Sequence, residues 1–167
     1  MSDESLLLKI RNLEIDGITD ERRVRIINDV SLDLHRGQVL GLIGESGAGK
    51  STLGLAGMGF TRDGCEIVGG SVMFDGIDLI NSSPQVKRGV LGKRIAYVAQ
   101  SAAASFNPSH RIVSQHTEAP MFHNVSSRAS SAEDAVELYR RLRLPEPETI
   151  GFRYPHQVSG GQLQRAM

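Results

Sequence analysis

The first part of the chain alternates apolar and polar residues, which is the pattern of half-buried strands. Segments 6–15 (LLLKIRNLEI) and 23–35 (RVRIINDVSLDLH) mix β-branched with polar residues, and the second alternates well near its end. Such alternation is typical of an antiparallel sheet with one buried face. Segment 71–79 (SVMFDGIDL) places Asp75-Gly76 between apolar residues, which predicts a hairpin.

Two short runs are apolar almost throughout instead of alternating. They are 38–43 (QVLGLI) and 94–99 (RIAYVA). Continuous apolar runs of this length are typical of strands that are buried on both faces of a parallel sheet. We therefore expect both runs to be core strands of such a sheet.

Helical spacing replaces these patterns in the second half of the chain. Apolar residues recur three or four positions apart over 135–142, Ser130 with Glu133 matches a capping box, and Pro145 ends the run. We expect a mostly helical lobe over about 105–155. The order of sheet, buried strand, hairpin, buried strand and helices predicts an α/β fold with a small antiparallel part.

Composition and charge narrow the classes of function. The chain has 167 residues, 40% of them hydrophobic, with 19 Lys+Arg balanced by 19 Asp+Glu. The basic bias of a nucleic-acid-binding protein is missing, so we expect no nucleic acid as a partner. No apolar run approaches the roughly 18 residues of a membrane-spanning helix. The lone Cys65 and an acidic N-terminus that is unlike a secretion signal favour a soluble cytosolic protein.

One glycine-rich stretch carries the clearest chemistry. Residues 44–51 (GESGAGKS) match G-x-x-x-x-G-K-[ST] in full. In this pattern backbone N–H groups converge on phosphate oxygens, the lysine charge reaches the outer phosphates, and the hydroxyl binds Mg²⁺. The predicted nucleotide-binding residues are Gly44, Glu45, Ser46, Gly47, Ala48, Gly49, Lys50, Ser51 and Thr52. Lys50 is also predicted to act in catalysis, and Ser51 to bind Mg²⁺.

A second glycine motif lies near the end of the sequence. Ser159, Gly160, Gly161 and Gln162 precede a helical pattern, where backbone N–H groups and a hydroxyl can bind an anion. A Ser-Gly-Gly would also serve as a plain helix N-cap. The stretch VSGGQ resembles the LSGGQ signature motif of the ATP-binding-cassette (ABC) ATPases, and both motifs occur in that family's order. The resemblance implies that these four residues contact ATP.

Further matches extend the resemblance along the chain. Gln100 follows the run 94–99, where ABC ATPases carry their Q-loop glutamine, which implies a catalytic residue that reaches Mg²⁺ and the attacking water. Segments 44–52 (GESGAGKST), 105–112 (SFNPSHRI) and 153–167 (RYPHQVSGGQLQRAM) are similar to the oligopeptide/dipeptide/nickel branch of importer ATPases.

The resemblance implies a fold and a division of the chain. It implies a P-loop NTPase core of the ABC type with an N-terminal antiparallel β part and an inserted helical lobe. Residues 1–167 would be the N-terminal part of one ATP-binding domain. Within it, about 1–100 would form the α/β core, about 101–157 the helical lobe, and 158–167 the signature motif with the start of its helix.

The resemblance also implies partners and a mechanism. Two such domains, of the same or a homologous chain, pair head to tail around two ATP molecules. Each ATP lies between the phosphate loop (44–52) of one and the signature (159–162) of the other. Closure and hydrolysis drive transmembrane permease subunits, which a substrate-binding protein serves, at the cytoplasmic face of the inner membrane. The implied cargo is peptides or a similar small solute.

Two alternatives remain open at this stage. Nickel or another small substrate of the same branch could be the cargo, because an ATPase domain does not contact it. A soluble ABC ATPase that acts on DNA or ribosomes is the other alternative. The neutral charge and the compact helical stretch from Gln100 to Ser159 argue against that second alternative.

Two features depart from the family pattern. The Walker B strand, with its Mg²⁺-binding Asp and catalytic Glu, should follow the signature, but the 167 residues end in the preceding helix. We therefore expect the C-terminal core strands to be missing and residues 1–167 alone to hydrolyse little or no ATP. The family also stacks an aromatic residue on adenine from a loop after the first strand, and 14–24 contains none. That region offers Ile18, Val24, Arg22 and Arg23 instead, and the sequence does not choose among them.

Overall fold

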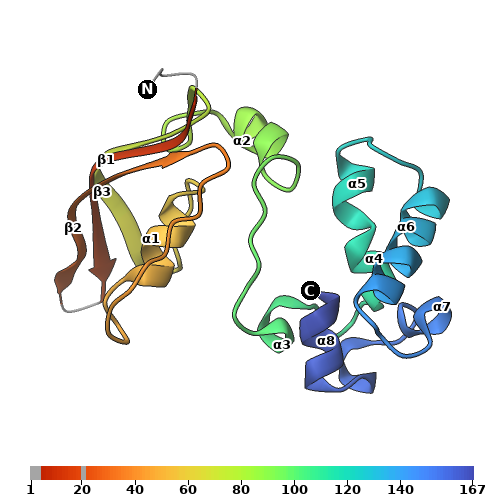
Figure 1. Cartoon of the computed structure of the whole chain (residues 1–167). Coiled ribbons are helices and arrows are strands. Elements are labelled where there is room, and N and C mark those ends of the chain that lie inside the picture. The colour runs from red at the N-terminus through yellow and green to blue at the C-terminus, as the bar shows by residue number, and fades with distance from the viewer. Residues whose placement is uncertain (1–4, 20–21) are drawn as a thin grey trace. The chain divides into compact units, whose positions relative to one another are not determined.

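The computed structural model describes residues 5–19 and 22–167 (Figure 1). It divides into two compact units, Met1–Lys87 and Arg88–Met167, and each is described by itself. The division at about residue 100 that the sequence suggested stays a prediction. No helix within the described ranges is long and apolar enough to cross a membrane.

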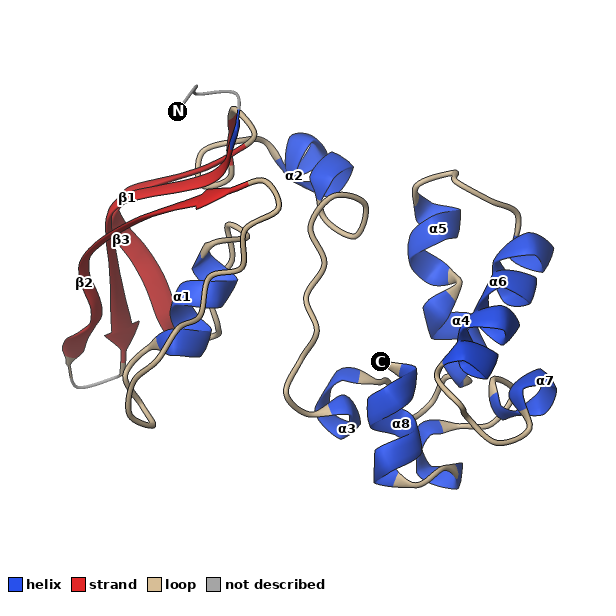
Figure 2. Ribbon diagram, in the orientation of Figure 1, coloured by secondary structure: helices blue, strands red, loops and turns tan. Residues whose placement is uncertain are grey.

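An antiparallel sheet forms the framework of the first unit (Figure 2). Its strands are β1 (Leu6–Ile18), β2 (Arg23–His35), β3 (Cys65–Phe74) and β4 (Ile77–Asp78), which pair in the order β2-β1-β3-β4. This confirms the antiparallel strands and the hairpin that the sequence predicted. The turn residues Asp75 and Gly76 have φ of 47° and 80°, as a two-residue hairpin of this twist requires.

The sheet buries one face beside helix α1 (Lys50–Ala56). Ile10, Leu13 and Ile15 of β1 are fully buried, and Val72 of β3 is buried with them. Packing of these apolar side chains is the main source of stability for a sheet of this size. The phosphate loop lies between β2 of this sheet and α1. The positions of the strand and the helix therefore determine where the loop lies.

Helices make up the second unit, as the sequence predicted for about 105–155. They are α3 (Ala102–Ser105), α4 (Ile112–His116), α5 (Glu118–Phe122), α6 (Arg128–Arg141), α7 (Pro147–Ile150), the 3₁₀ helix η2 (Pro155–Gln157) and α8 (Gly160–Ala166). Helix α2 (Pro84–Val90) spans the division between the units. Tyr139 of α6, Ile150 of α7 and Leu163 of α8 share one hydrophobic core.

The start of α6 corrects one prediction. The N-cap is Ser127, whose hydroxyl accepts a hydrogen bond from the backbone N–H of Ser130 at 3.2 Å, so Ser130 is not the cap. Ser131, Ala135 and Tyr139 lie four residues apart and are buried on one face of this helix.

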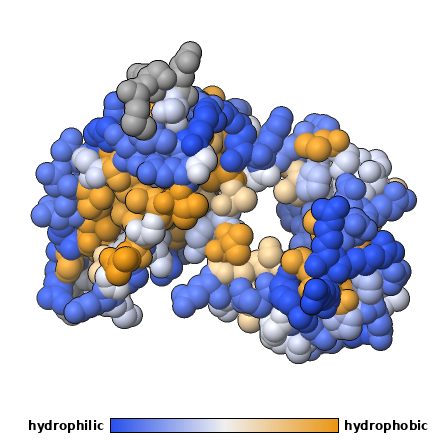
Figure 3. Space-filling model, viewed as in Figure 1, coloured by the Kyte–Doolittle hydropathy of each residue, from blue (hydrophilic) through white to orange (hydrophobic). Residues whose placement is uncertain are grey.

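The two continuous apolar runs are not strands, contrary to the sequence prediction. Residues 38–43 and 96–99 have no regular structure, and Ile95 forms only an isolated bridge with Leu91. A strand forms only through pairing, and no strand in the described part of the chain pairs with either run. Consequently Ile43 is 98% exposed, and apolar side chains reach the surface of the first unit (Figure 3).

Candidate nucleotide-binding site

The phosphate-loop residues form an exposed turn between β2 and α1. Gly47 and Gly49 have φ of 85° and 81°, a left-handed conformation that glycine adopts without steric cost. Helix α1 begins directly after the loop at Lys50. These two glycines therefore allow the backbone to make the sharp turn of the motif.

Gly49 is also packed against the sheet. A Cβ atom at this position would lie 2.7 Å from Ile27 Cδ1 and 3.3 Å from the carbonyl oxygen of Ile26. Both the space and the backbone conformation exclude a larger residue, so β2 anchors the end of the loop. Ile27 is not among the predicted site residues. The sequence signal for it is the apolar pair Ile26-Ile27, which interrupts the alternation of β2.

The loop encloses the ammonium group of its own lysine. Lys50 Nζ donates hydrogen bonds to the carbonyl oxygens of Gly44, at 2.8 Å, and Glu45, at 2.6 Å. No carboxylate among the described residues forms an ion pair with Lys50. The positive charge is therefore held at the loop and remains unneutralised, as a phosphate-binding group requires.

The hydroxyl residues after the lysine lie in the first turn of α1. Ser51 is exposed and Thr52 is half-buried. Within residues 5–19 and 22–167, the Ser51 side chain makes no hydrogen bond. Its oxygen is thus available as a ligand for a hard cation such as Mg²⁺, which prefers oxygen donors.

The signature residues lie at the start of α8 in the second unit. Ser159 Oγ accepts from the N–H of Gln162 at 3.2 Å, and the Ser159 N–H donates to Gln162 Oε1 at 2.9 Å. This reciprocal capping box starts the helix. Gly160 and Gly161 are exposed, and a Cβ on either would meet no atom of the described residues within 4 Å, apart from its chain neighbours and the backbone of its own helix. The internal structure therefore gives no steric reason for these two glycines.

A stacked group precedes the signature. The rings of Tyr154 and His156 lie 5.6 Å apart and nearly parallel, and the Arg111 guanidinium lies 5.8 Å from the Tyr154 ring centre. The Tyr154 N–H also donates to Gln157 Oε1 at 2.8 Å. These contacts fix the turn that leads into α8.

Gln100 does not end a strand, because residues 96–99 are irregular. Its side chain is exposed and makes no hydrogen bond within the part of the chain that the structure describes. Gln100 and the signature residues belong to the second unit, and the phosphate loop belongs to the first. The roles predicted for these residues stay predictions.

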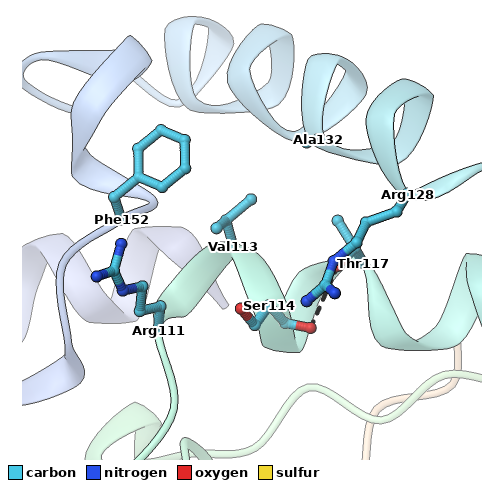
Figure 4. Close-up of a pocket in the computed structure, with 7 residues that line it drawn as sticks. All are labelled: Arg111, Val113, Ser114, Thr117, Arg128, Ala132 and Phe152. Atoms are coloured by element: carbon cyan, nitrogen blue, oxygen red, sulfur yellow. Dashed lines mark hydrogen bonds between the residues drawn. The ribbon is translucent and has the colours of Figure 1, made fainter.

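Two features of the second unit lie outside the predicted site. One is a pocket lined by Arg111, Val113, Ser114, Thr117, Arg128, Ala132 and Phe152 (Figure 4). The other is half-buried His116, whose Nδ1 lies 2.7 Å from the Tyr139 hydroxyl. Burial lowers the pKa of His116, and burial raises the pKa of Tyr139 to about 12. Both side chains are therefore neutral near pH 7.

Comparison with known families decides where the chain belongs. A family model described as "ABC transporter" matches residues 27–167. The chain belongs to the ABC transporter family. The resemblance that rested on the phosphate loop and the signature motif is thereby confirmed.

The chain is similar to several ATP-binding proteins of transport systems. The probable peptide ABC transporter ATP-binding protein of Sinorhizobium fredii is 38% identical over 163 residues, which cover 97% of this chain and 49% of the relative. The dipeptide transport ATP-binding protein of Lactococcus lactis is 34% identical over 165 residues, covering 98% and 47%. The chain spans about half the length of these curated relatives.

Solved structures confirm the fold of the ABC family member. A dimeric bacterial ABC transporter cassette superposes with a TM-score of 0.80 at 22% identity, over 96% of this chain and 66% of that one. A dimeric post-hydrolysis state of an ATP-binding cassette, bound to ADP and Pi, gives a TM-score of 0.77 at 22% identity, with the same coverage. The fold is that of an ABC ATPase cassette, with the antiparallel sheet at its N-terminal side.

Proposed function

We propose that this chain is the ATP-binding part of an importer ATPase that couples ATP binding and hydrolysis to the uptake of peptides or a similar small solute. The phosphate loop carries this proposal, because its lysine is enclosed by loop carbonyls and keeps an unneutralised charge. The names of the relatives, which include peptide and dipeptide transport proteins and a glutathione import protein of Shigella dysenteriae, support the substrate class.

ATP would be held by the residues of the loop and the first turn of α1. Residues 44–52 bind its phosphates, with Lys50 on the outer ones, where charge develops during transfer. Ser51 and Gln100 supply oxygen atoms for Mg²⁺, whose charge helps to neutralise the phosphates. Gln100 also orients the attacking water. The side chains of Ser51 and Gln100 are exposed and make no hydrogen bond among the described residues, which supports these assignments.

The signature residues act toward a second ABC ATPase domain. Residues 159–162 face the ATP that is held by the phosphate loop of the partner, in a head-to-tail dimer. The open space around Gly160 and Gly161 supports this role, because glycine lets a backbone approach a ligand closely. Permease subunits and, through them, a substrate-binding protein complete the importer, so the protein works at the cytoplasmic face of the cell membrane.

Residues 1–167 by themselves hydrolyse little or no ATP in this proposal. The sequence contains no Asp-Glu pair after an apolar run of strand length, so it offers no carboxylate to orient the attacking water. Phosphate release by the purified chain 1–167, measured with saturating ATP and Mg²⁺, tests this. Turnover comparable to that of an intact importer ATPase would contradict it.

ATP-driven dimerisation tests the sandwich. ATP is titrated into the whole protein by calorimetry, and the mass is followed by light scattering. Gly160→Asp is expected to bind ATP like the wild type but to stay monomeric, because its carboxylate would face the phosphates of the partner. Gly89→Asp is the matched control, since Gly89 is also an exposed helical glycine with open space around it. ATP-driven dimers of Gly160→Asp would contradict the proposal.

A further inference from the structure

We propose that the cavity beside α4 and α6 binds a small dicarboxylate, with one guanidinium group at each end of the ligand. The cavity has a volume of about 230 Å³, and all of its lining residues belong to the second unit. None of them belongs to the phosphate loop or to the signature, so the inference does not depend on the proposed function. It assigns a second ligand to the chain.

The lining of the cavity is positively charged. It contains the guanidinium groups of Arg111 and Arg128 and no Asp or Glu side chain. Neither arginine forms an ion pair with a carboxylate among the described residues. In contrast, Arg140, Arg141 and Arg153 of the same unit each pair with a glutamate. Two unneutralised guanidinium groups at one cavity favour an anionic ligand.

The two guanidinium groups lie on opposite sides of the cavity (Figure 4). Arg111 directly precedes α4, and its side chain extends toward Phe152. Arg128 is the first residue of α6, and its side chain lies on the other side of Val113. The Arg111 guanidinium also lies 5.8 Å from the Tyr154 ring centre, a cation–π contact that does not neutralise its charge. A ligand that binds both arginines therefore carries an anionic group at each end.

Apolar groups line the space between the two cations. Val113 and Ala132 lie there, and the Phe152 ring forms a wall at one end. The Thr117 hydroxyl is already engaged, since it donates to the carbonyl oxygen of Ser114 at 3.2 Å. The Ser114 hydroxyl remains available to donate to a carboxylate. The middle of the ligand is therefore a short hydrocarbon chain, because apolar groups bury methylene groups favourably and cannot hydrogen-bond polar ones.

The backbone holds the cavity in shape without a ligand. The Val113 N–H donates to the carbonyl oxygen of Gly151 at 2.7 Å, and the Ile112 N–H donates to that of Arg153 at 3.0 Å. These two bonds fix Phe152 beside the start of α4. A Cβ on Gly151 would lie 3.0 Å from Val113 Cβ, so the two segments pack closely. The Phe152 side chain is nonetheless exposed. A preorganised cavity of this kind loses little free energy to ordering when it binds a ligand.

Three matched ligands test the two-ended geometry. Adipate carries a carboxylate at each end of a short methylene chain, its isomer propylmalonate carries both on one carbon, and hexanoate carries only one. Each is titrated by calorimetry into the whole protein near pH 7.5, without nucleotide. We expect adipate to bind with a Kd of about 1 mM or lower and at least about tenfold more tightly than the other two ligands, because only adipate reaches both guanidinium groups.

Arginine variants assign one carboxylate to each guanidinium group. Arg111→Gln and Arg128→Gln should each weaken adipate binding about tenfold, to the level of hexanoate on the wild type. Arg128→Lys keeps the charge and should lose less than about threefold. Arg88→Gln is the control, because Arg88 is an exposed arginine of the same unit that does not line the cavity. It should bind adipate normally.

Thermal unfolding separates a lost ligand contact from a fold defect. Each variant is first unfolded without ligand, followed by circular dichroism, and should match the wild type. Saturating adipate should then raise the unfolding temperature of the wild type and of Arg88→Gln, but raise that of Arg111→Gln and Arg128→Gln less, since only binding to the folded state stabilises it. Phe152→Ala removes an exposed apolar wall and should weaken adipate binding about two- to fivefold.

Four results would overturn the inference. Equal affinities for adipate and propylmalonate would show that total charge alone attracts the ligand. Equal affinities for adipate and hexanoate would show that only one guanidinium group binds. Unchanged adipate binding in both glutamine variants of the cavity would place the ligand elsewhere. The absence of adipate binding at about 10 mM would exclude the site. Failure of the proposed function would leave all these results unchanged, because they are measured without nucleotide.

Discussion

The phosphate loop and the signature turn each precede a helix of seven residues, yet the chain constrains their glycines differently. Gly49 has a φ of 81°, and a Cβ there would lie 2.7 Å from Ile27 Cδ1. Gly160 lies at the start of α8, does not have a positive φ, and has open space around it in the described structure. One glycine is required by its own unit and the other is not.

A glycine can be required for folding, or it can be required for contact with something outside the chain. A glycine that packs against its own sheet is explained by folding, so Gly49 alone says little about a ligand. A glycine that its own unit leaves unconstrained points to something outside the chain, which is how Gly160 and Gly161 support a partner domain. The evidence for phosphate binding comes instead from Lys50, whose ammonium group the loop holds.

Removing the lysine should have the largest effect on the phosphate loop. Lys50→Ala deletes a charge that would meet the outer phosphates, and charge-assisted hydrogen bonds of this kind contribute about 1.5–3 kcal/mol each. We expect the ATP Kd to rise at least about thirtyfold in calorimetry. Lys93→Ala, at an exposed lysine of the second unit, is the control and should bind normally. Unchanged ATP affinity in Lys50→Ala would show that Lys50 does not bind the phosphates of ATP.

Gly49→Ala tests whether folding requires this glycine. The substitution combines a positive φ with a Cβ contact of 2.7 Å, so we expect a loss of about 2–3 kcal/mol in the free energy of unfolding. Urea denaturation followed by circular dichroism measures it. Gly54→Ala is the matched control in the same helix, with open space and no positive φ, and should be neutral or stabilising by up to about 1 kcal/mol. Equal stabilities of the two variants would contradict the steric argument.

Local pattern predicted the antiparallel part of the fold and failed for the two apolar runs. The strands over 6–15 and 23–35 follow from alternation, and the hairpin follows from a dipeptide whose backbone conformation fixes the turn. The run 38–43 has the composition of a buried strand, but a strand depends on its neighbours. Because nothing in the described sheet pairs with it, its apolar side chains are exposed.

The same distinction applies to the candidate site. The phosphate-binding residues could be predicted because their chemistry depends on adjacent positions in one loop. The close packing of Gly49 against Ile27 of β2 could not, since it depends on how β1 pairs with β2 and on where α1 begins. Alternation alone gives no signal for a packing contact of this kind.

Acid should destabilise the second unit, which holds the signature residues. His116 is half-buried beside Tyr139, whose ring lies in the core that also holds Leu163 of α8, and burial lowers the pKa of His116 below its ordinary value of 6.5. The unfolded chain therefore binds the proton more readily than the folded one. The stability that neutral His116 contributes is complete above pH 6.5 and is lost as the pH falls from 6.5 toward the folded pKa.

Helix content and urea unfolding, measured between pH 7.5 and pH 5, test this prediction. One proton can change the unfolding free energy by at most about 1.4 kcal/mol per pH unit. His116→Gln keeps a hydrogen-bonding group but does not titrate, so its stability should fall less over the same range. An identical pH dependence of the two proteins would show that other groups dominate.

Gly160→Ala should have the smallest effect and completes the comparison. A Cβ at this position meets open space, and alanine favours a helix over glycine by up to about 1 kcal/mol in the helix interior, and by less at its first position. We expect a gain of about 0.5 kcal/mol in unfolding free energy and an ATP Kd within about twofold of the wild type at concentrations where the protein is monomeric. A loss of stability as large as that of Gly49→Ala would mean that the second unit itself requires the glycine. The signature turn would then no longer indicate a partner.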